Sequence, residues 1–332
     1  MNTRSQTAAP DRSPAAGARR PDGRTQPLRL PSVDEGLRYA SRYWTATLRN
    51  RLSEHRLHTG CVGRYAAPVR ISERLLRRWQ ALFGTDGSQP PVPFNHGQSV
   101  ATLLQARIFA DLGFNGRHLL HLQHATTHVA APADCARSRH QELVCSLQGA
   151  WCLDGGKALI ALRTEIRRPS DEGGALLAVQ DDRFLIRNLP ATDLAVLGCD
   201  LRALQALQGL RERQPQIDPA TPGARVVALP LAADLGRRYG RVSGDFNPVH
   251  GGGLLARLFG GRRPFLQGLG LRNAVLRELA ALGLPLDELR LCFVSPAYLG
   301  QTLRLVVLCG HFELVDGAGR VVACGQASRP PA

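Results

Sequence analysis

A five-residue motif that occurs twice constrains the fold of this chain more than any other feature. The sequences PFNHG at 93–97 and PFLQG at 264–268 each lead into a long, largely apolar segment, at 97–112 and 268–282. In both halves, runs typical of antiparallel strands follow the apolar segment. The same order of helix and strands, met twice, predicts a duplicated α+β unit.

Shorter elements fill in each half. Apolar residues at 72–83 recur at helical spacing, with Ser72 as a plausible N-cap, and 231–242 predicts a second short helix. The predicted strands are 119–129, 142–153 and 158–168 in the first half and 289–294, 302–314 and 320–328 in the second. Asp316-Gly317 predicts a hairpin turn between the last two strands.

Composition divides the chain into four parts. Residues 1–31 are rich in Ala, Pro, Arg, Ser and Thr and have too few large apolar side chains to offset the entropy of ordering, which predicts a disordered tail. We place the first α+β unit at 32–168 and the second at 226–330. The stretch 169–225 is broken by several prolines, which predicts a connector.

Charge alone favours no function. The 42 basic and 27 acidic residues give a net charge of +15, a balance often seen in nucleic-acid-binding proteins. Aromatic residues are only 5% of the chain, too few for a base-stacking platform. We rank a purely compositional excess of arginine first, an anionic small molecule or carrier protein second and nucleic acid third, and therefore expect no nucleic-acid partner.

Cysteine spacing and hydropathy limit the cellular compartments in which the protein is expected. The eight cysteines occur singly, without a CxxC pair, which favours reduced thiols over a disulfide framework or a zinc module. No run approaches the 18 consecutive apolar residues of a membrane-spanning helix. We therefore expect a cytoplasmic protein.

Four histidines suggest a metal site at first sight. His118, His121, His124 and His128 are spaced by 3, 3 and 4 residues, as on one face of a helix. The surrounding residues favour a strand, on which 118, 124 and 128 point one way and 121 the other. Because the run contains no carboxylate or thiolate to complete a site, we expect structural histidines and no metal.

The segment YGRVSGDFNPVH at 239–250 holds the most informative chemistry. Asn-Pro after Gly-Asp favours a rigid turn, and Asp245 and His250 are five residues apart across it. A carboxylate beside an imidazole can hold a water molecule and move its proton. The alternative is a structural turn in which Asp245 caps the backbone and His250 is merely exposed.

This segment resembles a known family. Together with Ala256, RLFG at 257–260 and RPFLQG at 263–268, it is similar to the MaoC-like (R)-specific enoyl-thioester hydratases and 3-hydroxyacyl-thioester dehydratases of the double hot-dog type, over about residues 65–330. The resemblance implies an α+β double hot-dog fold, in which two antiparallel sheets each wrap around a long central helix and form a pseudo-dimer within one chain. It leaves open whether two chains form a homodimer.

The resemblance also implies residue roles. Asp245 and His250 would activate the water that adds to C3, and the same pair would give C2 its proton. Asn247 would orient the pair, and Ser243 would support the loop. The backbone N–H of Gly268, at a helix start, would bind the thioester oxygen.

The second landmark departs from the family at one position. Gln267 replaces the usual histidine, and we place it with Arg263 at the substrate entrance. Arginines 257, 262, 272 and 277 surround this entrance in sequence and suit the phosphates of coenzyme A or an acidic acyl carrier protein.

The first half lacks the Asp-x-Asn-Pro-x-His motif. Only 10 positions separate Asp86 from His96, against 22 from Asp245 to Gln267. We therefore expect a non-catalytic first half, whose vacated space accepts a long acyl chain, and one site per chain.

The implied reaction is the reversible dehydration of a (3R)-hydroxyacyl thioester of coenzyme A or acyl carrier protein to the trans-2-enoyl thioester, without a cofactor. The alternative is a catalytically weak acyl-binding or partner subunit, suggested by Gln267.

Overall fold

The structure is a computed structural model. It describes residues 26–27, 63–84, 98–114, 119–131, 135, 138–153, 155–189, 198–199, 217–245, 247–258 and 262–329. Within these ranges, no helix is long and apolar enough to cross a membrane. The six cysteines whose side chains are described there are free thiols.

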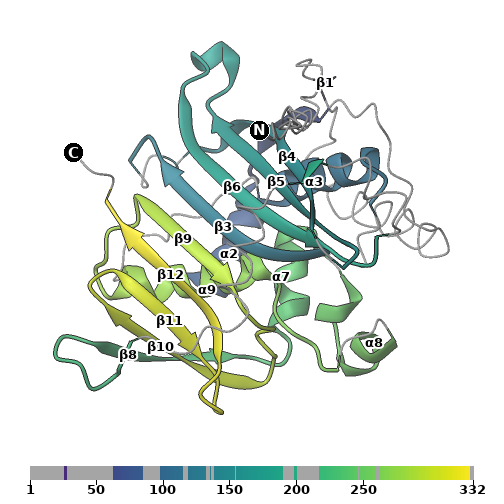
Figure 1. Ribbon diagram of the computed structural model, residues 1–332. Helices are drawn as coiled ribbons and strands as arrows, with labels where there is room; N and C mark the ends of the chain where they lie inside the picture. Colours follow the sequence, from purple (N-terminus) through teal and green to yellow (C-terminus); the bar gives the residue numbers. More distant parts are fainter. Residues whose placement is uncertain are drawn as a thin grey trace, which may run out of the picture.

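Two halves share one order of main elements, a strand, two helices and four strands, to which each half adds short helices of its own (Figure 1). The first half contains β2 (Arg64–Arg70), α2 (Glu73–Phe83), α3 (Gln98–Asp111), β3 (Leu119–His128), β4 (His140–Leu153), β5 (Lys157–Arg167), η3 (Ser170–Glu172) and β6 (Leu176–Ile186). The second contains β8 (Arg225–Leu231), α7 (Leu235–Ser243), η4 (Pro248–His250), α8 (Gly253–Leu258), α9 (Gly268–Ala281), β9 (Glu288–Phe293), β10 (Gln301–Leu308), β11 (His311–Val315) and β12 (Val321–Ser328). Two short strands, β1 (Gln26–Pro27) and β7 (Gly198–Cys199), add to the first half.

Strand order confirms the duplication. The sheet runs β2-β4-β5-β6-β3 and then β9-β12-β11-β10-β8, so each half places its second strand beside that of the other half. At this junction β3 and β9 are antiparallel, with Gln123 opposite Cys292 and Thr127 opposite Glu288. The two expected sheets are therefore joined into one twelve-stranded sheet.

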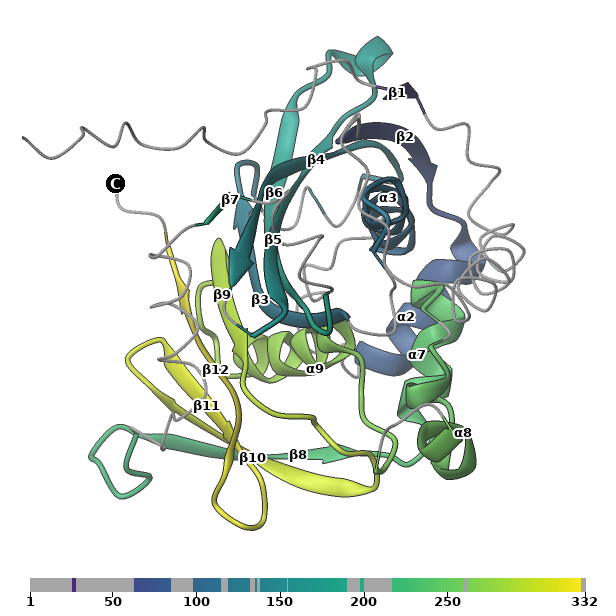
Figure 2. The ribbon, with the colours of Figure 1, turned by 45° about the vertical axis from the view of Figure 1, so that its right-hand side comes forward.

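Each half of the sheet curves around one central helix, α3 or α9 (Figure 2). A helix enclosed in this way must be apolar on nearly all sides. In α9 the buried residues are Gly270, Leu271, Arg272, Asn273, Ala274, Val275, Leu276 and Leu279. The predicted helices at 97–112 and 268–282 and the double hot-dog fold are thus confirmed.

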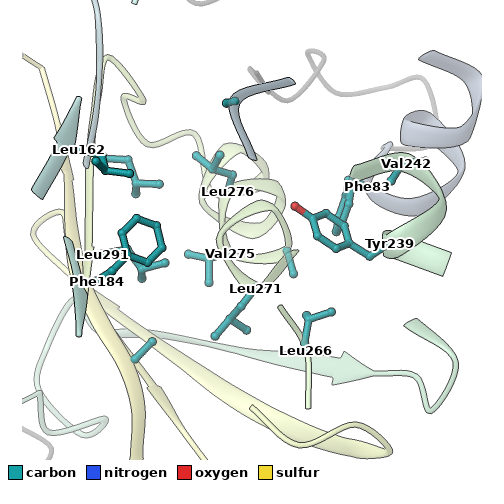
Figure 3. Close-up of a cluster of buried hydrophobic side chains, with 14 of the residues drawn as sticks. Phe83, Leu162, Phe184, Tyr239, Val242, Leu266, Leu271, Val275, Leu276 and Leu291 are labelled. Atoms are coloured by element: carbon teal, nitrogen blue, oxygen red, sulfur yellow. The ribbon is translucent and has the colours of Figure 1, made fainter. Parts of the chain in front are cut away.

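Helices α2 and α7, one from each half, pack against each other. α2 begins after Ser72, whose Oγ accepts the N–H of Leu75, as the sequence predicts. Tyr239 of α7 meets Trp79 edge to face at 5.8 Å between ring centroids. Figure 3 shows Tyr239 on one side of α9, while Leu162 and Leu291 lie on the sheet side.

The predicted boundaries are wrong in three places. Leu176–Ile186, assigned to the connector, forms β6, because its alternation is masked by buried polar residues such as Gln180 and Asp182. The predicted strand 302–314 is two strands joined at Cys309-Gly310, both with positive φ, as in a tight hairpin turn. β2 and β8 were not predicted at all.

The predicted tail is ordered at one described point. Gln26 and Pro27 form β1, which pairs in parallel with Tyr65 and Ala66 of β2. The rest of 1–31 lies outside the described residues, as do Asp86 and His96.

Gly325 of β12 lies where two strands of the sheet pack closely, and a substitution there tests this packing. A Cβ at this position would overlap the backbone carbonyl of Arg290 on β9. We expect Gly325→Ala to lower the free energy of unfolding by about 1–3 kcal/mol, since neither backbone can move without breaking the ladder. Gly317→Ala is the matched control because its Cβ would meet open space. Denaturant unfolding measures both, and equal stability of the two variants would contradict the packing.

Candidate active site

Successive side chain–backbone hydrogen bonds build the loop after α7. The helix ends at Gly244, which has a φ of 72° and donates its N–H to the carbonyl of Gly240. Ser243 Oγ accepts the N–H of Asp245 at 3.2 Å, Asp245 Oδ1 accepts that of Asn247 at 3.1 Å, and Asn247 Oδ1 accepts that of Val249 at 3.3 Å. These turns lead directly into η4.

The structure brings Asp245 and His250 together across this loop. Asp245 Oδ2 lies 3.9 Å from His250 Nε2, too far for a direct hydrogen bond but suited to a molecule hydrogen-bonded to both. The side chain of Asp245 is 31% exposed, and that of His250 is 9% exposed. Asp245 thus caps the turn with one oxygen and faces the imidazole with the other.

The protonation of His250 follows from its surroundings. Its Nδ1 lies 2.7 Å from the carbonyl oxygen of Phe265, an acceptor only, so the neutral ring carries its proton there and presents a lone pair at Nε2. Burial lowers the pKa of His250, while the charge of Asp245 and the Phe265 carbonyl oppose this shift. The ring is therefore a neutral proton acceptor near pH 7.

Gln267 holds the loop in place. Its Nε2 donates to the carbonyl oxygens of Gly236, at 3.1 Å, and Asp245, at 3.0 Å. The residue is only 3% exposed, so its assignment to the substrate entrance is wrong: it lies beneath the loop. The start of α7 lies close to the backbone of His250 because residue 236 is a glycine: a Cβ there would overlap the carbonyl oxygen of His250.

The start of α9 leaves backbone donors available. Gln267 occupies the N-cap position, and its side chain makes no hydrogen bond to the first N–H groups of the helix. These groups and the helix dipole favour negative charge. A Cβ on Gly268 would lie 3.1 Å from the Phe293 ring and 3.3 Å from His121 Nδ1, so the glycine lets side chains of β9 and β3 reach the helix start.

The predicted entrance arginines separate into two groups. Arg263 is exposed and lies over the ring of Tyr298, at 5.2 Å, and Arg257 and Arg262 are exposed as well. Arg272 is not at an entrance, because it is 1% exposed and donates to Thr126 Oγ1 at 3.0 Å. Arg277 forms an ion pair with Glu278.

The histidine run contains a structure that the sequence did not predict. A bulge between His121 and Gln123 shifts the register of β3 against β6. His121 and His124 therefore face the same side, not opposite sides, and both contact Asp182 Oδ1, at 2.8 and 2.7 Å. His118 lies outside the described residues.

Hydrogen bonds extend this cluster from α3 to α9. Asp182 Oδ2 accepts from Gln105 at 2.7 Å, and His124 Nε2 contacts the hydroxyl of Thr126, the same hydroxyl that Arg272 reaches. Burial by itself would raise the pKa of Asp182, but His124 and His121 lower it, so the carboxylate is ionised. Burial lowers the pKa of His124 to about 4 against the opposing effect of Asp182, so this ring is neutral.

This cluster has the composition of a metal site but the contacts of a hydrogen-bond network. The ligand atoms of His121, His124 and Asp182 lie within 4.8 Å of one another. Both ring nitrogens of His124 are engaged, one with Asp182 and one with Thr126. These contacts support the expectation of structural histidines for His124. The carboxylate was missed because it belongs to β6, which the sequence placed in a connector.

Known structures share this architecture. No family model matches the sequence, and no curated protein sequence matches it. HtdX of Mycobacterium tuberculosis superposes over 80% of this chain and all of its own, with a TM-score of 0.56 and 19% identity. A MaoC-like dehydratase from Phytophthora capsici covers 80% of this chain and 94% of its own, with a TM-score of 0.58 and 17% identity.

A third structure is much longer. Peroxisomal multifunctional enzyme type 2 from Drosophila melanogaster matches 91% of this chain with 53% of its own, at a TM-score of 0.57 and 19% identity. At these identities the likeness is one of fold: the chain has the double hot-dog fold in the form seen in MaoC-like dehydratases.

Removing the amide of Gln267 tests its positioning role. Gln267→Leu would leave the buried carbonyl of Gly236 and the half-buried carbonyl of Asp245 without this donor, and we expect a loss of about 1–3 kcal/mol in the free energy of unfolding. Gln148→Leu on the exposed face of β4 is the control, with a change within about 0.5 kcal/mol. Urea denaturation compares them, and a stable Gln267→Leu protein would show that the loop is held by other contacts.

The low pKa of His124 predicts a specific dependence of stability on pH. Below about pH 6.5 the unfolded chain binds a proton at this residue, whereas the folded protein does so only near its pKa of about 4. Stability is therefore lost as pH falls through this window, by about 2 kcal/mol at pH 5 for this group.

His124→Gln removes the titrating group and retains an amide that can bond to Asp182 and Thr126. We expect a smaller loss of stability between pH 7 and pH 5 than in the native protein, measured by denaturant unfolding. His140→Gln, which removes an exposed histidine of β4, is the control for the loss of a histidine as such. An unchanged slope in His124→Gln would mean that this ring is protonated in the folded state.

Proposed function

We propose that this protein catalyses the reversible dehydration of a (3R)-hydroxyacyl thioester to the trans-2-enoyl thioester. The observation that carries the proposal is the position of the Asp245–His250 pair, 3.9 Å apart, beside the uncapped start of α9. A general base and donors for an oxyanion are the two groups that this reaction needs.

In the hydration direction, a water molecule lies between Asp245 Oδ2 and His250 Nε2. The imidazole takes one proton from the water, and the hydroxide adds to C3 of the enoyl thioester. The electron pair of the double bond moves to the thioester oxygen, where the N–H of Gly268 stabilises the enolate. Protonation at C2 completes the addition, and dehydration is the reverse.

The carrier is coenzyme A or acyl carrier protein. The exposed guanidinium groups of Arg257, Arg262 and Arg263 follow the site along the chain, and guanidinium groups bind phosphates and carboxylates well. Both carriers are anionic, and the protein has a net charge of +15. Electrostatic attraction would therefore assist binding of either carrier.

The second candidate is an acyl-thioester-binding subunit with weak catalysis, suggested by Gln267. The hydrogen bonds of Gln267 to the loop assign it a positioning role, which is compatible with catalysis. Turnover of crotonyl-CoA or a longer enoyl thioester, followed by the loss of enoyl absorbance, separates the two: binding without turnover would favour the second candidate.

The Asp245 carboxylate gives the sharpest test. Asp245→Asn retains an oxygen for the N–H of Asn247 but loses the charge that activates water, so we expect kcat to fall at least ~10²-fold with an unchanged melting temperature. His250→Ala should lower kcat to a similar extent. The double variant should be scarcely worse than either single, because the two residues act on one water.

Asp234→Asn is the matched control, since this exposed carboxylate at the start of α7 makes no capping hydrogen bond. It should keep the native kcat. An Asp245→Asn protein with near-native kcat and a markedly lower melting temperature would leave Asp245 with its capping role alone.

A further inference from the structure

A second imidazole–carboxylate pair lies at the start of α9, and the first half of the chain supplies it. His121 comes from β3, and its Nε2 lies 2.8 Å from Oδ1 of Asp182 on β6. Its other nitrogen, Nδ1, lies 3.3 Å from the point that a Cβ on Gly268 would occupy. Gly268 directly follows Gln267, whose side chain holds the Asp245 loop. Both imidazoles thus adjoin the segment 265–268.

The hydrogen bonds of Asp182 determine what His121 presents at this point. The ionised carboxylate accepts Nε2–H of His121, and this bond selects the tautomer whose lone pair is at Nδ1. Among the described residues, Nδ1 has no hydrogen-bond partner. The side chain is 15% exposed, whereas Asp182 is 1% exposed. A basic nitrogen is therefore held at the helix start with its own carboxylate behind it.

The ring of His121 is fixed in orientation. It stacks on Phe184, with centroids 4.5 Å apart and planes 19° apart, and it contacts Phe293 at 4.9 Å. Asp182 is itself held by Gln105 and His124. A proton acceptor constrained by packing and by such surrounding bonds meets the geometric requirement for catalysis.

We propose that His121, oriented by Asp182, is a second proton-transfer residue of the active site and exchanges the proton at C2 of the thioester bound at Gly268. This inference rests on the proposed function. It separates the C2 step from the water step, which the family resemblance places on the single Asp245–His250 pair.

The proton balance is complete without a further reactant. In dehydration, the C2–H bond breaks, its proton goes to His121 Nδ1, and its electron pair moves to the thioester oxygen as an enolate at the start of α9. The enolate then expels hydroxide from C3, which takes the proton that solvent has placed on His250 Nε2 and leaves as water. In hydration both transfers reverse, and exchange with solvent resets the two imidazoles between turnovers.

Proton exchange at C2 isolates this step. Butyryl-CoA has no leaving group at C3, so it can undergo only enolisation, and in D₂O each enolisation replaces a C2 hydrogen with deuterium, measured by mass spectrometry. We expect the native protein to catalyse exchange and His121→Gln to slow it at least ~10²-fold, together with kcat for hydration. His121→Phe keeps the ring stack and should show the same losses.

The control is another histidine of the same strand. His128, at the far end of β3, has its Nδ1 3.0 Å from the carbonyl of Leu286, and His128→Gln should retain native exchange and turnover. Asp245→Asn should lose turnover but continue to exchange C2 hydrogens. Circular dichroism and the melting temperature of the two His121 variants establish that each is folded.

The outcomes separate the two proposals. A native protein that neither binds nor turns over any acyl thioester would overturn the proposed function and this inference together. Native turnover that is unchanged in folded His121→Gln would overturn this inference alone. Exchange lost in Asp245→Asn but retained in His121→Gln would do the same and return the C2 proton to the Asp245–His250 pair.

Discussion

The antiparallel pairing of β3 with β9 is the interaction on which the rest of the structure depends. It joins the two halves into one sheet and carries the side chains of β3 to the start of the other half's helix, α9. Without this pairing, His121 of the first half would not reach the start of α9, beside the Asp245 loop of the second half. The junction therefore both completes the fold and assembles the candidate site from two distant parts of the chain.

A buried polar network crosses the same junction. Arg272 of α9 is connected through Thr126 and His124 to Asp182 on β6. Taking a guanidinium and a carboxylate out of water costs several kcal/mol per ion, and only good hydrogen bonding offsets this. Burial lowers the pKa of Arg272 to about 10, partly opposed by Tyr239 and Asp182, so it stays charged at neutral pH. The buried charge of Arg272 makes α9 differ from α3, the corresponding helix of the first half.

The sequence predicted those features that depend on residues close together in the chain. The apolar surfaces of α3 and α9, the N-cap at Ser72 and the convergence of Asp245 and His250 across their turn all follow from short stretches of chain. Contacts between strands that are far apart in the sequence could not be predicted. The bulge that turns His121 towards Asp182 exists only in the pairing with β6, and the buried polar residues of β6 conceal its strand pattern. The amide of Gln267 likewise bonds to backbone carbonyls that sequence alone could not locate.

Side chain–backbone hydrogen bonds explain how the candidate pair is ordered without a direct bond between Asp245 and His250. The loop is held by the side chains of Ser243, Asp245, Asn247 and Gln267 through bonds to the main chain, not by an ion pair between Asp245 and His250. A direct ion pair would favour the protonated imidazole and occupy the lone pair at Nε2. The 3.9 Å separation, together with burial, keeps His250 neutral and its Nε2 available. His121 is prepared differently, because its carboxylate binds the nitrogen turned away from the helix start. In the described part of the chain, each ring is thus held through one nitrogen, Nε2 of His121 and Nδ1 of His250, and its other nitrogen has no hydrogen-bond partner.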